Sequence, residues 1–166
     1  MREDDIDHVL VAQADVYDPD ILEDRSFYQN RLDLSPNSCW VARDKMGGLQ
    51  GYLISYPWAG ELPPALGHAL PALPDDPDQW FIHDCAVLRR AQGRGVAAAL
   101  LRAGRRYAWH AGLRRCSLVS LGPAVGYWER YGYRPVQGVA PDVLARKLAQ
   151  YGEQACFMDC SIDMPS

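Results

Sequence analysis

The residues best suited to chemistry lie in a glycine- and arginine-rich segment at 86–101, AVLRRAQGRGVAAALL, between an apolar run and an alanine-rich run. Small residues that lead from a strand into a helix leave several backbone N–H groups unpaired at the positive end of the helix dipole. Such a concavity binds anions, because glycines let an oxygen approach the backbone closely. Neighbouring arginines add positive charge for a polyphosphate. The segment therefore predicts either a phosphate-binding cradle or a plain basic turn.

Two common phosphate-binding patterns do not fit this segment. The dinucleotide-binding fingerprint requires a third glycine where Ala98 stands, and an acidic residue at the end of the next strand, where Ser120 stands. The P-loop requires Gly-Lys-Ser/Thr, which occurs nowhere in the chain. A nicotinamide-dependent oxidoreductase is therefore disfavoured. Spacing alone leaves two registers open, R-x-x-G-x-G from Arg90 and Q-x-x-G-x-A from Gln92.

Composition indicates a single soluble domain. The 166 residues, 48% of them apolar, suffice for one domain over 1–166 with a substantial core. Neither a secretory signal nor a membrane-spanning run stands out, so we expect a cytoplasmic protein without membrane contact. The five cysteines are scattered without C-x-x-C or metal-type spacing, which predicts reduced thiols and no metal site.

Charge is segregated along the chain. Residues 1–24 are strongly acidic and residues 89–115 are basic. The net charge of −4 argues against a general nucleic-acid-binding protein. The two stretches are either solvated faces or the surroundings of a cationic and an anionic ligand.

Hydrophobic periodicity and turn signals divide the chain into helices and strands. We expect helices at 6–14, 21–32, 95–111, 124–131 and 142–150, and strands at 38–43, 49–58, 79–88, 115–121 and 155–162, with a further extended segment from Tyr133. The proline-rich stretch at 59–78 fits neither element and should be a surface excursion. This order predicts an α/β fold, a mixed sheet with helices on both faces.

Two motifs in this order resemble the GNAT superfamily of acyl-CoA N-acyltransferases. Residues 86–101 are similar, without gaps, to its central motif, in which a strand ending in Ala-Val leads through Q/R-x-x-G-x-G/A to a helix with Leu-Leu. Residues 124–133, AVGYWERYGY, resemble its later A-x-x-F-Y-x-x-x-G-F segment. The loop length within the first match selects the register that begins at Gln92. The resemblance covers most of the chain, from about Ile6 to Ile162.

The resemblance implies that two parallel central strands part into an opening that holds acetyl-CoA. Backbone groups of 85–87 would pair with the pantetheine amides, and N–H groups of 93–97 would hold the pyrophosphate. The cofactor-binding residues expected in this way are Cys85, Ala86, Val87, Gln92, Gly93, Arg94, Gly95, Val96, Ala97 and Trp128. The reaction would be direct attack of a neutral primary amine of a small molecule or peptide on the thioester, with the protein orienting both reactants.

Three residues are candidates for proton transfer. His83 lies where some GNAT members place a proton acceptor, and imidazole changes charge near neutral pH. Asp84 is a second candidate base, although in a regular strand it would point to the opposite face unless a β-bulge re-aims it. Both residues are equally compatible with structural roles. The tyrosine that many members use as general acid is Trp128 here, so Tyr127 can serve only if its helix starts irregularly.

The family pattern does not identify the acceptor, and the start of this chain departs from that pattern. Residues 1–5 leave little room for the strand that usually opens the fold, so either this edge strand is short or missing or the true start of the chain lies upstream. Candidates for an acidic, aromatic-walled amine pocket are Asp15, Tyr17, Glu23, Tyr56, Trp58 and His68. An acetyl-CoA-dependent N-acetyltransferase is the leading hypothesis. A non-catalytic acyl-CoA sensor is the alternative that Trp128 suggests, and an exposed final strand would permit a homodimer.

Overall fold

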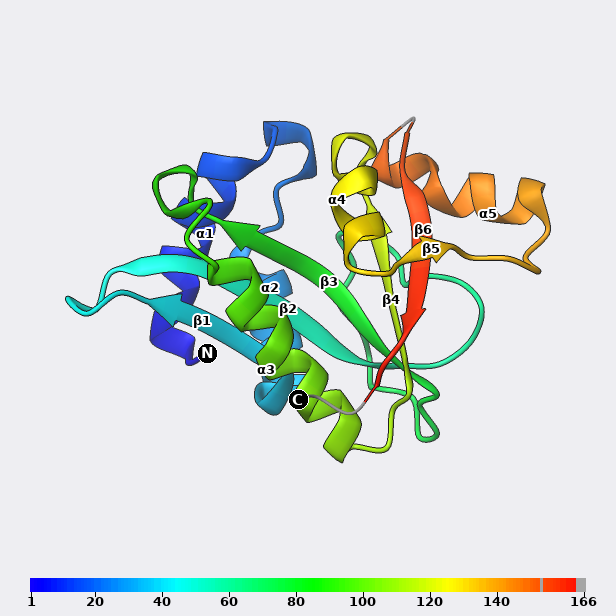
Figure 1. Cartoon of the computed structure of the whole chain (residues 1–166), viewed down its shortest axis with the longest axis horizontal. Coiled ribbons are helices and arrows are strands. Elements are labelled where there is room, and N and C mark those ends of the chain that lie inside the picture. The colour runs from blue at the N-terminus through cyan, green and yellow to red at the C-terminus, as the bar shows by residue number, and fades with distance from the viewer. Residues whose placement is uncertain (153, 164–166) are drawn as a thin grey trace.

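A computed structural model describes residues 1–152 and 154–163, in which six strands form one mixed sheet (Figure 1). The strands are β1 (Cys39–Arg43), β2 (Leu49–Trp58), β3 (Gln79–Val87), β4 (Arg115–Ser120), β5 (Arg134–Pro135) and β6 (Cys156–Ser161). Their order across the sheet is β1-β2-β3-β4-β6-β5. The pair β3–β4 is parallel and the other pairs are antiparallel. The expected mixed sheet is confirmed.

Helices cover both faces of this sheet (Figure 1). They are α1 (Ile6–Val16), α2 (Arg25–Leu34), α3 (Val96–His110), α4 (Val125–Arg130) and α5 (Pro141–Leu148). The helices α1 and α2 pack on one face around the buried side chains of Tyr28, Tyr52 and Ile54, whereas α3 and α4 pack on the other around Leu53 and Leu118. The two faces thus carry separate apolar cores.

In the N-terminal region the second helix starts later than expected, whereas the edge of the sheet is as expected. The second helix was expected at 21–32 but begins at Arg25, because Asp24 caps it and its Oδ1 accepts the N–H of Phe27 at 2.9 Å. Within the described residues no strand precedes α1, in line with a short or missing edge strand. The amino group of Met1 donates instead to the carbonyl of Cys39 on β1, at 2.9 Å.

Gly104 lets α3 lie very close to the sheet. A Cβ at this position would stand 2.2 Å from Cζ2 of Trp80 and 3.2 Å from a methyl carbon of Leu53. Trp80 is fully buried and its indole N–H donates to Ser55 Oγ at 2.8 Å, so it cannot move aside cheaply. The close helix–sheet contact therefore depends on the missing side chain.

We expect Gly104→Ala to lower the free energy of unfolding by ~1–3 kcal/mol, because overpacking outweighs the better helix propensity of alanine. The matched control is Gly126→Ala in α4, where a Cβ meets nothing within 4 Å. Urea unfolding of both variants measures the difference. Equal stabilities would show that the contact of α3 with Trp80 is not tight.

The segment 59–78 is the expected surface excursion, without helix or strand, and it is pinned in its middle. The side chain of Asn30 bonds both the N–H and the carbonyl of Leu70, at 2.9 and 3.0 Å. Arg31 donates to the carbonyl of His68 at 2.8 Å. Helix α2 therefore holds the excursion beside the sheet.

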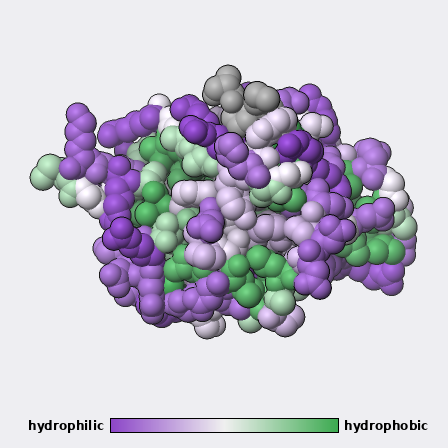
Figure 2. Space-filling model, turned by 90° about the horizontal axis from the view of Figure 1, so that it is seen from below, coloured by the Kyte–Doolittle hydropathy of each residue, from purple (hydrophilic) through white to green (hydrophobic). Residues whose placement is uncertain are grey.

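The surface adds two observations. On the face that Figure 2 shows, hydrophobic side chains form separate patches between hydrophilic ones and no continuous apolar area. In the part of the chain that the structure describes, none of the helices has the length and apolar character needed to cross a membrane.

Candidate active site

The two parallel central strands separate near their middle. Their paired residues run from Trp80 opposite Cys116 to Ile82 opposite Leu118, although β3 continues to Val87 and β4 to Ser120. Among the described residues, β3 beyond Ile82 pairs with β2 alone. A cavity of about 590 Å³ lies at this separation and extends to the start of α3 and to the excursion. The structure therefore contains the opening that the resemblance implied.

The glycine-rich segment forms the start of α3 at one end of this cavity. Gly93 and Gly95 have φ of +73° and +78°, a left-handed conformation that glycine adopts without strain. Gly95 is the N-cap, and the first N–H to donate within the helix is that of Ala99, to the carbonyl of Gly95 at 3.0 Å. The N–H groups of 96–98 thus have no partner inside the helix and are available to an anion.

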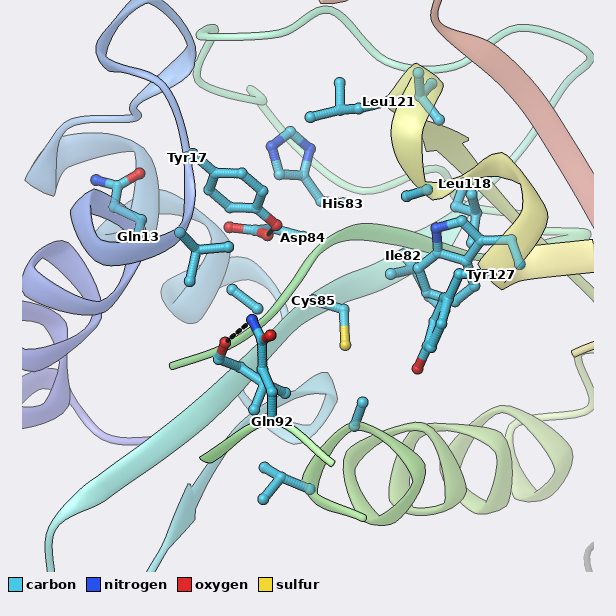
Figure 3. Close-up of a pocket in the computed structure, with 18 of the residues that line it drawn as sticks. Gln13, Tyr17, Ile82, His83, Asp84, Cys85, Gln92, Leu118, Leu121 and Tyr127 are labelled. Atoms are coloured by element: carbon cyan, nitrogen blue, oxygen red, sulfur yellow. Dashed lines mark hydrogen bonds between the residues drawn. The ribbon is translucent and has the colours of Figure 1, made fainter. Parts of the chain in front are cut away.

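Side chains around this segment favour the register that begins at Gln92. The Nε2 of Gln92 donates to the carbonyl of Val87 at 3.3 Å, which ties the loop to the end of β3 (Figure 3). Arg90 points away and donates to the carbonyl of Leu49 at 2.8 Å. Arg94 is exposed and does not contribute to the cavity wall. Only the backbone of Arg94, and not its side chain, can take part in the expected cradle.

A β-bulge in β3 turns His83 and Asp84 to the same face. The register with β2 passes from Ile54 opposite Asp84 to Ser55 opposite Ile82, so His83 is the extra residue. The His83 ring lies 4.6 Å from the ring of Phe27 in α2, between centroids, and Asp84 contacts Tyr17, just past α1. The alternative in which a bulge re-aims Asp84 is therefore the one observed.

Asp84 is held by three tyrosine hydroxyls. Its Oδ1 accepts from Tyr17 at 2.6 Å, and its Oδ2 accepts from Tyr52 and, at 3.4 Å, from Tyr28. Burial raises the pKa of the Asp84 carboxyl above its usual range, against the hydrogen bonds from Tyr17 and Tyr52, which lower it. Burial and the neighbouring Asp84 charge raise the pKa of the Tyr17 and Tyr52 hydroxyls. The phenols consequently remain donors at neutral pH.

The raised pKa of Asp84 predicts a pH-dependent stability. The folded state binds this proton more tightly than the unfolded state, so the associated stability is present at low pH and is lost as pH rises through the folded pKa. We expect Asp84→Asn to leave Tm unchanged or raise it by ~2–4 °C at neutral pH. The difference should shrink toward pH ~4, near the usual carboxyl value. Calorimetry at both pH values measures it, and a large loss of Tm at neutral pH would contradict the prediction.

His83 is held between Glu23 and Tyr56. Its Nε2 lies 3.3 Å from Oε1 of Glu23, and its Nδ1 lies 3.3 Å from the hydroxyl of Tyr56. Glu23 in turn accepts the N–H of Gly67 in the excursion at 3.2 Å. The side-chain amide of Gln13 in α1 donates to the carbonyl of Glu23 and accepts the backbone N–H of the same residue. The side chains of His83 and Glu23 are 3% and 9% exposed, and both residues line the cavity.

Asp84, His83 and Tyr17 lie together at one end of the cavity (Figure 3). Two groups able to accept a proton, an imidazole and a carboxylate, are thus adjacent in sequence and share one face. Glu23 adds a second carboxylate beside them. This end of the cavity is suited to a cationic or basic ligand, whereas the end at α3 is suited to an anion.

Tyr127 extends from α4 into the space between β3 and α3 (Figure 3). A general-acid role for Tyr127 required an irregular start of its helix. The helix α4 has such a start, because a 3-10 turn at Gly122–Ala124 precedes it. Trp128 is 8% exposed and packs on Tyr133, with ring centroids 5.2 Å apart. Burial, followed by the contact with Tyr131, raises the pKa of the Tyr127 hydroxyl. The hydroxyl therefore stays protonated at neutral pH and can donate.

The cavity brings most of the residues expected from the sequence together. Its wall includes His83, Asp84, Tyr127, Cys85, Ala86, Val87, Gln92, Gly93, Gly95, Val96, Ala97 and Trp128. Of the acceptor candidates, Tyr17 and Glu23 line it, and Tyr56 is buried behind His83.

The other acceptor candidates have different partners. The carboxylate and carbonyl of Asp15 accept the N–H and Nε of Arg89, at 2.9 and 2.7 Å, which links α1 to the loop after β3. The side chains of Trp58 and His68 bond carbonyls of the excursion, those of Leu62 and Leu66. These three residues do not line the cavity.

The sequence did not reveal Gln13, Tyr28 and Tyr52 as part of the site. Tyr28 and Tyr52 are fully buried and have the spacing of ordinary core residues in α2 and β2. The Tyr28 hydroxyl meets Asp84 only after α2 packs on the sheet, and the Tyr52 hydroxyl only after β2 pairs with β3, so no local signal could have identified them.

Comparison with known families assigns the chain to a family. Residues 5–133 match the family model described as the acetyltransferase (GNAT) family, and the protein belongs to that family. A search of curated protein sequences finds no significant match.

Solved structures with the same fold are distant in sequence. Ard1 from Thermoplasma volcanium is 15% identical with a TM-score of 0.72, over 99% of this chain and 95% of that chain. A GphF GNAT-like decarboxylase in complex with isobutyryl-CoA is 14% identical with a TM-score of 0.77, over 98% and 97%. A GNAT family acetyltransferase from Brucella melitensis in complex with acetyl-CoA is 18% identical with a TM-score of 0.59, over 100% and 87%. At these identities the likeness concerns the fold.

Proposed function

We propose that this protein is an N-acetyltransferase that moves an acetyl group from acetyl-CoA directly to a primary amine. The observation that supports this most strongly is a single cavity that runs from the start of α3, along the free edge of β3, to Glu23, His83 and Asp84. One end offers donors for a diphosphate and the other offers acceptors for an amine. The two reactants would meet where β3 and β4 separate.

In this proposal the acyl-CoA is held mainly by backbone groups. The N–H groups of 93–97 bind the diphosphate at the positive end of α3. The pantetheine amides pair with β3 at 85–87, where β4 no longer does. Similar folds with acetyl-CoA and isobutyryl-CoA bound support an acyl-CoA ligand. Fixing the thioester in this way supplies the proximity and orientation that a direct transfer between two bound reactants requires.

The amine would be bound and deprotonated at the other end. Glu23 and Asp84 attract the ammonium form, and the Glu23–His83 pair takes up the proton through the Glu23 carboxylate as the neutral amine attacks the thioester carbonyl. Glu23 holds the imidazole by its contact with Nε2. Asp84 and Tyr17 form the second route by which a proton could leave the amine. The departing thiolate takes its proton from the Tyr127 hydroxyl.

The role of Tyr127 predicts a loss of turnover without its hydroxyl. We expect Tyr127→Phe to lower kcat by about tenfold, less than a typical general acid contributes, because a thiolate leaves readily. Tyr107→Phe in α3, whose ring packs on Trp40 and does not line the cavity, is the control and should retain full turnover. Steady-state kinetics measures both. A full-rate Tyr127→Phe enzyme would mean that the thiolate leaves without help from this residue.

A non-catalytic acyl-CoA sensor is the second candidate, because Trp128 stands where many GNAT members have their acid. A thiol-release screen over polyamines, aminoglycosides, amino acids and peptides separates the two functions. Release of CoA with at least one class of amine supports the enzyme and identifies its acceptor. Tight binding of acetyl-CoA without release by any amine supports the sensor.

A further inference from the structure

A second reactive centre lies outside the cavity, between β4 and β6. Cys116 of β4 stands directly opposite Cys160 of β6 in the antiparallel ladder, and both are free thiols. Directly opposed residues have Cα atoms about 4.5 or 5.5 Å apart, depending on the kind of pair. Both separations fall within the ~4.4–6.8 Å that a disulfide spans. Neither residue lines the cavity described above.

Cys160 has the surroundings of a reactive thiolate. Nη2 of Arg105 in α3 donates to its Sγ at 3.1 Å and also reaches the carbonyl of Ser161 at 3.4 Å, which fixes the guanidinium. The interaction with the Cys116 thiol and then that with Arg105 lower the pKa of Cys160 to about 6, although partial burial opposes the shift. The thiolate form therefore prevails at neutral pH, and it is the thiolate that reacts with electrophiles.

An oxidant can reach this thiolate. Cys160 is partly exposed and contributes to an open recess together with Arg115, Gly132, Arg134, Asp159 and Ser161. The other charged groups of the recess are Arg115 and Asp159, paired at 2.7 Å, and Arg134. With Arg105 above the sulfur, the surroundings are net positive and stabilise an anion.

Cys116 differs from Cys160 in the way that a resolving cysteine requires. It is fully buried, and burial raises the pKa of its thiol well above the usual value. It therefore keeps its proton, and its sulfur lies 2.9 Å from the hydroxyl of Tyr133. A protected thiol opposite an accessible thiolate is the arrangement of redox-sensing cysteine pairs.

We propose that Cys160 reacts with hydroperoxides and that Cys116 resolves the product to a disulfide across β4 and β6. The Cys160 sulfur attacks the terminal oxygen of the hydroperoxide, the O–O bond breaks and the other oxygen leaves as alkoxide, or as hydroxide from hydrogen peroxide, which oxidises the thiolate to a sulfenic acid. The Cys116 sulfur then attacks the Cys160 sulfur, and the sulfenic oxygen leaves as water with the proton of the Cys116 thiol. This site is independent of the proposed acetyl transfer.

The first test is the pH dependence of alkylation by iodoacetamide, followed residue by residue by mass spectrometry on the folded protein. Cys156 is the internal control, since it lies on the same strand and is partly exposed, while burial raises its pKa. Cys160 should react with a midpoint near pH 6, well below that of Cys156. In Arg105→Gln the Cys160 midpoint should rise by ~1 pH unit or more. A Cys160 midpoint equal to that of Cys156 overturns the proposal.

The second test uses hydrogen peroxide with dimedone as a trap for the sulfenic acid. The wild-type protein should form a Cys116–Cys160 disulfide, and Cys156→Ser should behave like it. Cys116→Ser and the more apolar Cys116→Ala should instead accumulate dimedone on Cys160. Cys160→Ser should leave Cys116 reduced. If Cys156 is oxidised as fast as Cys160, the proposal that Cys160 is the reactive thiol is overturned. If the wild-type protein carries only the trapped sulfenic acid, the proposal that Cys116 resolves it to a disulfide is overturned.

Discussion

Gly95→Glu is expected to weaken acetyl-CoA binding by at least ~100-fold, or ~2.7 kcal/mol, while the fold persists. Its Cβ would meet nothing within 4 Å, so the substitution causes no clash. The new carboxylate would stand at the N-cap of α3, among the N–H groups proposed for the diphosphate. It would compete for those donors and repel the phosphates. Calorimetric titration with acetyl-CoA measures the loss.

The matched control is Gly112→Glu at the other end of α3. Gly112 has φ +82°, close to the +78° of Gly95, and a Cβ there also meets nothing within 4 Å. Both variants carry the cost of a left-handed conformation, and because the dipole of α3 favours a carboxylate at its start and disfavours one at its end, Gly112→Glu should be the less stable of the two. Only Gly95→Glu should lose affinity. Unchanged affinity in this variant would show that α3 does not hold the diphosphate.

His83→Ala is expected to lower kcat by about 100-fold below pH ~8, with a smaller effect above, where more of the amine is already neutral. The KM for acetyl-CoA should change little, because His83 lies at the end of the cavity away from α3. His83→Gln keeps a hydrogen-bonding group beside Glu23 but cannot take up a proton, so it should be similarly slow. A pH–rate profile of each variant measures the effect.

Two comparisons make this prediction specific. His110→Ala removes an exposed histidine at the end of α3 and should leave the profile unchanged. Asp84→Asn tests the neighbouring route through Tyr17. An unaltered profile in His83→Ala together with a slow Asp84→Asn enzyme would assign the proton to Asp84 and remove His83 from the mechanism.

Local sequence signals were sufficient for the framework of the fold. The strand expected at 49–58 from its aromatic and β-branched residues has the predicted bounds, and the helix expected at 95–111 forms at Val96–His110. The start of the second helix was wrong because capping by Asp24 outweighs the apolar periodicity that begins at Ile21. Propensity and periodicity describe isolated segments, whereas a cap depends on one particular side chain.

The two ends of the cavity differed in how well they could be predicted. The proposed cradle lies in one short segment, so spacing and resemblance were enough to predict that Gln92, Gly93 and Gly95 lie together, and all three line the cavity. The proposed amine end depends on tertiary structure. The bulge at His83 exists only in the pairing of β3 with β2, and Glu23 reaches His83 only when α2 and the excursion are in place.

The most direct test of the proposed reaction follows the acetyl group itself. Acetyl-CoA labelled in its acetyl group is incubated with the protein and the most active amine of the screen, and free CoA thiol and labelled products are counted. Direct transfer predicts one labelled amide for each thiol released. Label recovered as free acetate, or acetyl-CoA that is bound but not consumed with any primary amine, would contradict N-acetyl transfer by this protein.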